Sequence, residues 1–400
     1  MEVRVLAVLN PKKVSTESIA SEENLCFALD ITMQELNYAK NLAEDEKYQA
    51  SSVEKSDGSQ RKIFNPDFRI RKIQRRLNKR IFSNEKVINW PDHLYGSIPN
   101  QTNENKEWIN KDYVSCAARH CGAKSILKMD IKDFFDNIHK VFVYDIFLNF
   151  LKYSPEVSET LSKICCMHHH IVQGALTSSY IASLVLYDVE GYVVEKLQRK
   201  NLIYTRLVDD ITISSKVSNY DFSYALDLVK DMLSQKELPL NQKKTKIQYT
   251  SSEPLTVHGL RVAFKQPRLP SDEVARIRTA VKNIETLASE CGYRTTHAYR
   301  HDFNRCMGRV NKLSRVNHEK HESLIMRLLK VYPLPSKKDI ERAKKIVSRL
   351  EKDYALKRET YWYNRRFYTA HERLNILKRS FPCITKELRK RIKPLRPKYD

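Results

Sequence analysis

Residues 202–215, LIYTRLVDDITISS, place two adjacent aspartates between two short apolar runs. This pattern predicts a β-hairpin whose bend carries Asp209 and Asp210. A third acid, Asp130, ends the apolar run 125–131, SILKMDI, which predicts a buried strand. Carboxylates at the ends of buried strands are costly unless they are paired, hydrated or bound to a metal. The alternative readings are ordinary turn chemistry for the adjacent pair and a helix cap for Asp130.

The three aspartates suit a hard divalent cation such as Mg²⁺, which prefers oxygen ligands. Two such ions about 3.5–4 Å apart can activate an attacking hydroxyl and stabilise a leaving oxygen in phosphoryl transfer. A single carboxylate could not bridge two ions, whereas two converging strands could.

Positive charge is concentrated in the last third of the chain. The 400 residues carry 71 Lys+Arg and 48 Asp+Glu, a net charge of +23. Residues 265–400 hold 35 of these basic residues and only 15 of the acidic ones, and residues 61–80 form a smaller basic segment. A nucleic acid is the expected polyanionic partner. Solvated helix faces and an acidic membrane surface are the alternatives.

The composition excludes several classes of protein. A hydrophobic content of 41% is enough for a core. No apolar run reaches the roughly 20 residues of a membrane helix, and the first residues lack a signal-peptide pattern. Eight cysteines without framework spacing suit a reducing compartment. We therefore expect a cytoplasmic protein that does not engage a membrane.

The coarse pattern of elements changes near residue 266. Before it, helices and strands alternate, and beyond Pro270 the pattern is helical. The segments expected to matter for the site are a turn at Asp57-Gly58 between two strands, a basic helix over 68–82, helices over 133–150, 177–197 and 222–233, and strands over 246–249 and 256–264.

Six motifs in order carry a resemblance. They are Lys55-x2-Gly58-x2-Arg61-x-Ile63, Met129-Asp130-Ile131-Lys132-Asp133-Phe134-Phe135, Gln173-Gly174-x2-Thr177-Ser178, the hairpin of residues 204–214, Leu240-Asn241-x2-Lys244-Thr245, and Val257-His258-Gly259-Leu260. In this order they resemble the reverse transcriptases, and among them the bacterial retron-type and antiphage-defence branch. The resemblance spans residues 22–264.

The resemblance implies an α+β fold of the right-hand polymerase type, with fingers, a palm built on an antiparallel sheet with helices, and an α-helical thumb. We expect an N-terminal helical region over 1–54, fingers with part of the palm over 55–125, and the palm with the catalytic motifs over 126–265. Residues 266–400 would form the thumb and an extended basic helical C-terminus.

The resemblance also implies the catalytic residues. Asp130, Asp209 and Asp210 would hold two Mg²⁺ ions, with Mn²⁺ as a substitute, and the carbonyl of Ile131 would be a further ligand. Lys244 would lie near the pyrophosphate as a candidate proton donor.

The nucleotide-contacting residues follow from the same motifs. Arg61 and Lys55 would bind the triphosphate, because a guanidinium makes bidentate contacts to phosphate oxygens. Phe135 would fill the space that a ribose 2′-hydroxyl needs and so favour deoxynucleotides. Gln173 would line the incoming nucleotide, and Gly259 would belong to the turn that grips the primer.

The basic C-terminal third is a candidate RNA-binding region. Residues 361–368 interleave aromatic side chains with arginines, and Tyr361, Trp362, Arg365 and Arg366 are the candidate contacts to bases and phosphates. The alternative is an amphipathic helix whose aromatic residues form a core. The basic segment 386–398 could follow an RNA backbone.

Four motifs depart from the family pattern. Leu207-Val208 replaces the usual aromatic-Ala pair, and Ser179 replaces a proline. Val257-His258-Gly259 stands for the retron Val-Thr-Gly, and Cys116-Ala-Ala-Arg-His120 stands for Asn-Ala-x2-His. They leave open a retron enzyme or a defence-associated relative with unusual templating.

The function implied by the resemblance is RNA-directed DNA synthesis from dNTPs, with a dedicated structured non-coding RNA as template, a DNA product and a role in antiphage defence. Two alternatives remain: template-independent or protein-templated DNA synthesis, and an RNA-binding protein without catalysis. An effector protein, a second reverse transcriptase or a second copy of the chain are the further partners considered.

Overall fold

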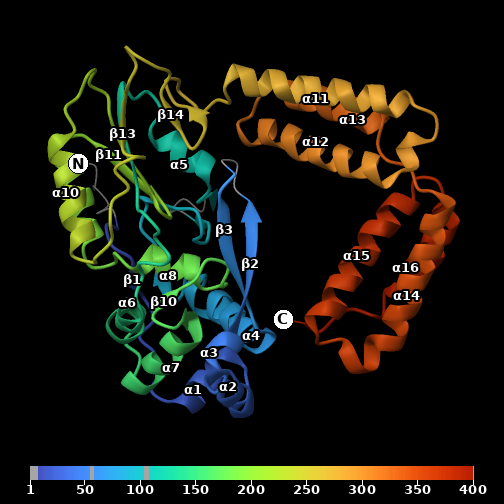
Figure 1. The fold of residues 1–400 in the computed structure, drawn as a ribbon, viewed down its shortest axis with the longest axis horizontal. Coiled ribbons are helices and arrows are strands. Elements are labelled where there is room, and N and C mark those ends of the chain that lie inside the picture. Colours follow the sequence, from blue (N-terminus) through green and yellow to red (C-terminus); the bar gives the residue numbers. More distant parts are fainter. Residues whose placement is uncertain (1–7, 55–57, 103–107, 400) are drawn as a thin grey trace. The chain divides into compact units, whose positions relative to one another are not determined.

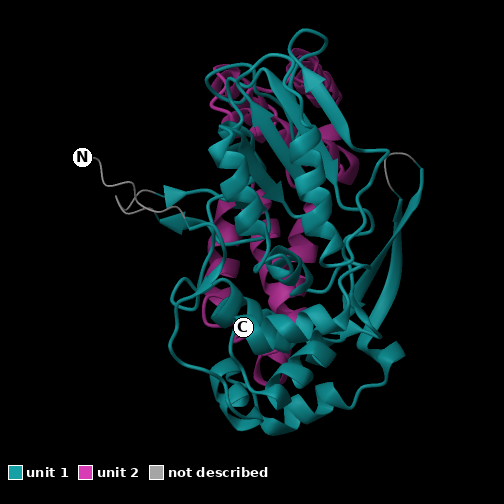
Figure 2. Ribbon diagram, turned by 90° about the vertical axis from the view of Figure 1, so that its left-hand side faces the viewer, with its two compact units in different colours: residues 1–267 teal, residues 268–400 magenta. Residues whose placement is uncertain are grey.

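The computed structural model describes residues 8–54, 58–102 and 108–399 (Figure 1). Its chain divides into two compact units, residues 1–267 and residues 268–400, which Figure 2 shows in different colours. Within the described ranges, no helix combines the length and the apolar character needed to cross a bilayer.

The first unit is built on a five-stranded sheet with the strand order β13-β8-β12-β11-β5. Its strands are β5 (Leu94–Tyr95), β8 (Ser125–Asp130), β11 (Ile203–Leu207), β12 (Asp210–Ser215) and β13 (Lys246–Tyr249). All neighbours are antiparallel except β11 and β5. The expected hairpin and buried strand are therefore adjacent in one sheet, which brings their aspartates to the same edge.

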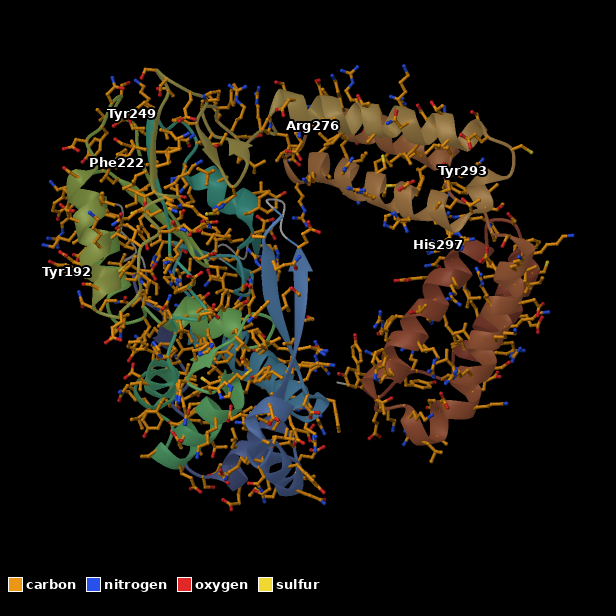
Figure 3. All side chains as sticks on the ribbon, viewed as in Figure 1. Tyr192, Phe222, Tyr249, Arg276, Tyr293 and His297 are labelled. Atoms are coloured by element: carbon orange, nitrogen blue, oxygen red, sulfur yellow. The ribbon has the colours of Figure 1, made fainter. Side chains whose placement is uncertain are left out.

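Helices cover both faces of this sheet. In Figure 1, α10 (Ser223–Ser234) lies on one side of the strands and α5 (Tyr113–Arg119) on the other. The remaining helical segments are α1 (Glu22–Leu29), α2 (Met33–Lys40), α3 (Glu44–Lys47), α4 (Phe68–Leu77), η1 (Asn78–Phe82), α6 (Lys140–Asp145), η2 (Ile146–Phe150), α7 (Pro155–Cys165), α8 (Ser178–Leu184) and α9 (Glu190–Arg199). Buried side chains of these helices and of the sheet form one continuous core from Ile19 to Leu238. Figure 3 shows side chains filling the space between the sheet and the helices.

A two-stranded ribbon extends from the helices of the first unit. It consists of β2 (Tyr48–Glu54) and β3 (Gln60–Pro66), which pair antiparallel along their whole length (Figure 1). The remaining strands form short pairs: β1 (Lys12–Lys13) with β4 (Ile88–Asn89), β6 (Gln101–Thr102) with β7 (Trp108–Ile109), β9 (Cys166–Met167) with β10 (His170–Ile171), and β14 (Thr256–Val257) with β15 (Leu260–Arg261).

Three expected elements are shorter than the sequence pattern indicated. The helix expected from Asp133 does not start there, because Asp133 has a φ of 45° and residues 132–137 form turns before α6. The helix expected over 177–197 breaks at residues 185–189, where the amide of Tyr187 bonds the carbonyl of Leu184 three residues back. The strand expected over 256–264 is instead the tight β14–β15 hairpin.

The second unit is helical throughout. It contains α11 (Ser271–Ser289), η3 (Tyr293–Thr295), α12 (His297–Arg315), α13 (Lys320–Lys330), α14 (Lys337–Lys357), α15 (Tyr361–Leu377) and α16 (Pro382–Ile392). Helices α11–α13 pack against one another, and so do α14–α16 around a separate core. The mixed α+β fold with C-terminal helices is confirmed.

At the junction of these two bundles, arginines hold the connecting segment. Arg379 donates to the carbonyl of Pro333 at 2.7 Å and lies 4.4 Å from the centroid of the Tyr332 ring. Arg294 donates to the carbonyl of Tyr332, also at 2.7 Å.

Candidate active site

The sheet register brings the three aspartates together. Asp130, the last residue of β8, is the direct partner of Asp210, the first residue of β12. Asp209 precedes it in the hairpin bend, and its carbonyl accepts a 3.0 Å hydrogen bond from the amide of Ile131. The structure therefore places Asp130, Ile131, Asp209 and Asp210 at one edge of the sheet, although the aspartates of the two strands are far apart in sequence.

The hairpin bend is held in a strained conformation by a buried ion pair. Val208, a β-branched residue, has a φ of 60°, which is unfavourable for such a side chain. The guanidinium of Arg206 donates to the Val208 carbonyl at 3.2 Å and to Glu190 of α9 at 2.6 Å. Both Arg206 and Glu190 are only 1% exposed. We infer that this pair fixes the backbone that carries Asp209.

The charge of this pair is fully compensated. Burial raises the pKa of Glu190, but the charges and hydrogen bonds of Arg206 and His93 together outweigh it, so that the pKa lies well below its ordinary value. Arg206 also donates to the carbonyls of Ala182 and Ser183 in α8. Sequence reasoning missed both residues, because an arginine and a glutamate give no sign in sequence that they are buried together.

Both oxygens of Asp130 are engaged by one loop. Lys244 Nζ donates to Oδ1 at 2.8 Å, and Asn241 Nδ2 donates to Oδ2 at 3.0 Å. The hydrogen bond to Asp130 raises the pKa of Lys244 above its ordinary value. Lys244 thus lies at the carboxylates, and its place near the pyrophosphate stays a prediction. Asn241 is a contact that the sequence analysis quoted in its motif but did not single out.

The negative charges of Asp209 and Asp210 are destabilised by their surroundings. Burial, and then the neighbouring charges of Asp209 and Asp130, raise the pKa of Asp210 to about 6. Burial and the Asp130 charge also raise the pKa of Asp209, against the opposing effects of Lys244 and Arg61. A cluster of carboxylates that repel one another is stabilised by a cation, so the donor set fits a divalent metal ion.

The carboxylates do not converge on a single point. Across residues 8–54, 58–102 and 108–399, no three His, Cys, Asp or Glu side chains form an assembled metal centre. The ammonium of Lys244 and the amide of Asn241 occupy the Asp130 oxygens instead. Each Asp130 oxygen accepts one hydrogen bond here and keeps a further lone pair with which it can bind a metal ion.

The β2–β3 ribbon approaches the site through β3 and the loop before α8. The amide of Phe64 donates to the carbonyl of Gln173 at 2.8 Å. Gly174 has a φ of 110°, and a Cβ there would lie 2.5 Å from the Phe64 carbonyl oxygen. Only glycine permits this approach. The contact holds Gln173 against the strand that carries Arg61.

Arg61 is exposed on β3, and its charge lowers the pKa of Asp209, which places it within electrostatic range of the carboxylates. Lys55 lies outside the described residues. Phe135 is half-buried, and its ring centroid is 6.1 Å from that of Phe134. It packs against the core and follows directly from the strand of Asp130.

Gly259 lies in the tight turn between β14 and β15. Gly259 has a φ of 79° and the preceding His258 a φ of 47°, as a two-residue hairpin turn of the I′ type requires. The turn brings His258 Nδ1 to 3.8 Å from Oδ2 of Asp210. Burial and the charge of Lys128 lower the pKa of His258 to about 4. His258 was noted in sequence only as a departure from the family pattern.

The aromatic segment of the second unit divides between core and surface. Tyr363 and Phe367 are buried, whereas Trp362 is 65% exposed and has the guanidinium of Arg365 5.6 Å from its ring centroid. Tyr361 packs edge-on against Trp362. Arg366 forms an ion pair with Asp353 of α14 at 2.5 Å, so it has a structural partner that the sequence did not indicate.

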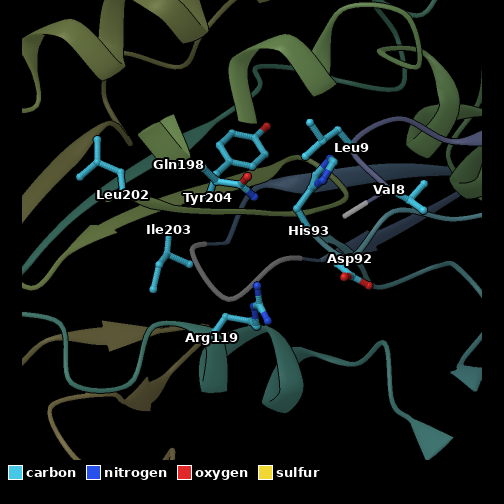
Figure 4. A pocket seen from close by; sticks show the side chains of 9 residues that line it. All are labelled: Val8, Leu9, Asp92, His93, Arg119, Gln198, Leu202, Ile203 and Tyr204. Atoms are coloured by element: carbon cyan, nitrogen blue, oxygen red, sulfur yellow. The ribbon is translucent and has the colours of Figure 1, made fainter. Parts of the chain in front are cut away.

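A small pocket lies next to β11, away from the carboxylates (Figure 4). Its volume is about 90 Å³, and His93, Arg119 and Tyr204 are among the residues that line it. Ligand pockets usually measure about 300–1,000 Å³, so this one is too small for a nucleotide. Among the described residues, the candidate active site remains the edge with the aspartates.

The chain is similar to known proteins over most of its length. The family pattern of reverse transcriptase (RNA-dependent DNA polymerase) matches residues 53–282. The chain is 47% identical over 371 residues to the Retron Ec48 reverse transcriptase of Escherichia coli, covering 92% of this chain and 90% of that one.

The chain belongs to the retron-type reverse transcriptases. The Retron Se72 reverse transcriptase of Salmonella heidelberg (strain 579083-10) is 30% identical over 330 residues, which cover 82% of this chain and 83% of that one. Among solved structures, apo telomerase from Candida tropicalis matches 96% of this chain and 67% of its own, with 13% identity and a TM-score of 0.40. As a member of the family, this reverse transcriptase is an RNA-directed DNA polymerase whose chemistry depends on a divalent metal ion.

Proposed function

We propose that this reverse transcriptase copies a dedicated structured non-coding RNA into DNA from dNTPs, in the cytoplasm and as part of antiphage defence. The observation that carries the catalytic part is the pairing of Asp130 with Asp210 beside Asp209. The family membership supports RNA as the template. The defence role rests on the resemblance of the motifs to the antiphage-defence branch.

We assign two Mg²⁺ ions, with Mn²⁺ as a substitute, to Asp130, Asp209, Asp210 and the Ile131 carbonyl. Ions held by these residues would supply activation of the primer 3′-hydroxyl and stabilisation of the leaving pyrophosphate. The raised pKa values of Asp209 and Asp210 support this assignment, because each carboxylate gains from a neighbouring cation. Lys244 is the candidate proton donor to the pyrophosphate, and its hydrogen bond to Asp130 keeps it protonated in the metal-free protein.

The nucleotide is proposed to lie between the β2–β3 ribbon and the carboxylates. Arg61, with Lys55 beyond the described residues, would bind the triphosphate, and Gln173 would contact the incoming nucleotide. Phe135 would select against a 2′-hydroxyl, and Gly259 would belong to the primer grip. In this proposal residues 1–54 form the N-terminal helical region and 55–125 the fingers with part of the palm. Residues 126–265 form the palm, and 266–400 the thumb and its basic extension.

The RNA contacts of the second unit are assigned to its exposed aromatic and basic residues. Tyr361, Trp362 and Arg365 offer a ring surface with an adjacent guanidinium, which suits stacking on bases. Arg366 can reach a phosphate only by sharing or leaving Asp353.

A groove of about 630 Å³ between α15 and α16 adds a second basic surface to these residues. Its lining includes Tyr368, His371, Arg389, Lys393 and Arg396 and contains no acidic residue. This composition supports binding of an RNA backbone with a base against the aromatic residues.

The test is to purify the wild type and an Asp209→Asn/Asp210→Asn variant from cells that carry the native locus, and to sequence the RNA and DNA that co-purify. We expect one dominant RNA with both proteins and its complementary DNA only with the wild type. DNA that matches no bound RNA favours template-independent or protein-templated synthesis. RNA without DNA in both samples, together with failure to extend a supplied primer with Mg²⁺, favours a non-catalytic RNA-binding protein.

Partner proteins are identified in the same purification. An effector protein or a second reverse transcriptase would co-purify, and a second copy of the chain would double the mass measured by light scattering.

A further inference from the structure

Two departures from the family pattern contact each other beside the active site. Cys116 of α5 and His258 of the β14–β15 turn are 142 residues apart, yet Cys116 Sγ lies 3.3 Å from His258 Nε2. The other ring nitrogen, Nδ1, faces Asp210 at 3.8 Å from Oδ2. The imidazole therefore lies between a buried thiol and a proposed metal ligand.

The contact continues into the sheet as a chain of polar groups. Cys116 Sγ also lies 3.3 Å from Thr205 Oγ1 on β11. Thr205 Oγ1 is 2.7 Å from His120 Nε2, and His120 Nδ1 is 2.7 Å from Ser214 Oγ on β12. Burial, aided by the charges of His258 and Arg119, lowers the pKa of His120 to about 3, so it stays neutral in the chain. The chain links α5, both strands of the catalytic hairpin and the β14–β15 turn.

The chemistry of the partners favours one arrangement of hydrogens at His258. An ionised carboxylate only accepts hydrogen bonds, so the tautomer with its hydrogen on Nδ1 is the one attracted to Asp210. Nε2 is then free to accept from the thiol of Cys116. The 3.8 Å distance to Asp210 exceeds that of a hydrogen bond, and a small rotation of the carboxylate would close it.

A thiol, an imidazole and a carboxylate in this order also occur in nucleophilic enzymes. Here Cys116 is fully buried, and burial raises the pKa of its thiol to about 12. A nucleophile needs an accessible thiolate. The arrangement therefore serves to position groups and not to attack a substrate.

The backbone of the turn sets the direction of the His258 side chain. His258 has a φ of 47°, the left-handed conformation that a two-residue I′ turn requires and that histidine adopts more often than most residues. In this conformation the turn directs the imidazole under the catalytic hairpin, where it is mostly buried, with 11% of the side chain exposed.

We propose that His258, oriented by Cys116, is a positioning residue that fixes the carboxylate of Asp210 and couples it to the turn carrying Gly259. This inference rests on the proposed function, in which Asp130, Asp209 and Asp210 hold the divalent ions. Its consequence is that Cys116 affects metal binding only through His258, although Cys116 touches neither metal nor substrate.

The test measures Mn²⁺ binding to the full-length protein without nucleic acid, from the electron paramagnetic resonance signal of free Mn²⁺. We expect His258→Ala to weaken Mn²⁺ binding about 10-fold, as loss of an outer-shell partner commonly does. Cys116→Ala should weaken it less, and the Cys116→Ala/His258→Ala double variant should match His258→Ala alone. Cys121→Ala is the control. It removes a thiol just beyond α5 that is not part of the series of polar groups from His258 to Ser214, and it should leave Mn²⁺ binding unchanged.

A second variant separates positioning from folding. In His258→Asn the amide nitrogen can replace Nδ1, and asparagine tolerates a left-handed φ. We expect His258→Asn to keep Mn²⁺ affinity within about 2-fold of the wild type and to make it insensitive to Cys116→Ala. The melting temperature of each metal-free variant identifies any that is simply unfolded.

The outcomes distinguish failure of the proposed metal site from failure of the positioning role of His258. Equal Mn²⁺ binding by the wild type and Asp209→Asn/Asp210→Asn overturns the proposed metal site itself. Binding that requires those aspartates, but is unchanged in His258→Ala and His258→Asn, overturns only the positioning role. Independent, multiplicative losses in Cys116→Ala and His258→Ala also overturn it, because the two residues would then act separately.

Discussion

Lys244 Nζ donates to Oδ1 of Asp130 at 2.8 Å, although the two residues are 114 positions apart. A protonated ammonium thus lies against one of the three carboxylates, and the hydrogen bond raises the pKa of that ammonium further. In this position Lys244 offsets the charge of Asp130 in the metal-free protein, whereas Asp209 and Asp210 still repel each other and Asp130.

Replacing Lys244 tests its role in proton transfer. We expect Lys244→Met to slow single-turnover primer extension by about 100-fold or more, since general acid catalysis commonly contributes that much. The pH dependence of the remaining rate should lose its alkaline limb. Lys246→Met is the matched control, because Lys246 pairs with Glu253 and not with the aspartates. An equal rate for Lys244→Met and Lys246→Met contradicts the assignment.

Replacing Asp210 should stabilise the metal-free protein at neutral pH. The folded-state pKa of Asp210 is about 6, above the ordinary value of 3.8, so the folded protein binds a proton that the unfolded chain has released. Ionisation of Asp210 therefore lowers the free energy of unfolding. This loss is complete above about pH 6 and absent below the pKa that Asp210 has in the unfolded chain.

For this half-exposed carboxylate, we expect Asp210→Asn to raise the free energy of unfolding by about 1 kcal/mol at pH 8, after allowance for solvent screening. The gain should disappear near pH 4. Urea unfolding in a chelator at both pH values measures it, with Asp227→Asn on exposed α10 as control. A loss of stability at pH 8 would show that Asp210 is favourably paired in the free protein.

The approach of the β2–β3 ribbon to Gly174 is testable by adding one methyl group. A Cβ at this position lies 2.5 Å from the Phe64 carbonyl oxygen and requires an unfavourable φ of 110°. We expect Gly174→Ala to destabilise the protein by about 1–3 kcal/mol and to raise the KM for dNTPs, because it displaces the strand of Arg61.

Gly308→Ala is the matched control, and we expect it to stabilise the protein where Gly174→Ala destabilises it. Gly308 lies inside α12 with no atom near an added Cβ, so alanine should stabilise the protein by about 0.5–1 kcal/mol. A Gly174→Ala protein with wild-type stability and KM contradicts the proposed position of the ribbon.

The buried pair of Arg206 and Glu190 should matter for both stability and catalysis. Glu190→Gln leaves the guanidinium buried without its counter-charge, which typically costs about 3–5 kcal/mol. Glu195→Gln on the same helix removes an exposed pair with Arg199 and should change stability by less than about 0.5 kcal/mol. Thermal unfolding of the two variants gives the comparison, and equal melting temperatures would exclude a structural role for the pair.

Phe135 is predicted to select dNTPs over rNTPs. We expect Phe135→Ala to reduce the preference for dNTPs over rNTPs by about 10- to 100-fold, because the ring no longer excludes the 2′-hydroxyl. Incorporation of single dNTPs and rNTPs on one primer–template measures the ratio. Phe134→Ala disrupts the core instead, since Phe134 is buried. If the ratio is unchanged in Phe135→Ala, another group performs the selection.

The local pattern of the sequence predicts those parts of the site that lie within single elements. Asp209 and Asp210 follow from two short apolar runs joined at an acidic bend, and Asp130 from an apolar strand that ends in an acid. Their convergence requires β8 and β12 to be neighbours, which only the motif order indicated. Periodicity could not detect the left-handed Asp133 or the break at residues 185–189, because apolar spacing continues through both.

Long-range polar contacts are the part that the sequence does not predict. Arg206 with Glu190, Asn241 with Asp130, and Cys116 with His258 each join segments whose partners are fixed only by the folded sheet. Burial of a charged or polar side chain depends on its partner, and the partner is not visible in a local pattern.

The most direct test of the central claim is primer extension by the purified protein on an RNA template with an annealed DNA primer. The wild type should add the dNTPs that the template encodes, only with Mg²⁺ or Mn²⁺ present, and Asp210→Asn should add none while still binding the primer–template. Extension by Asp210→Asn at the wild-type rate, or by the wild type in a chelator, would contradict catalysis by the carboxylates of Asp130, Asp209 and Asp210.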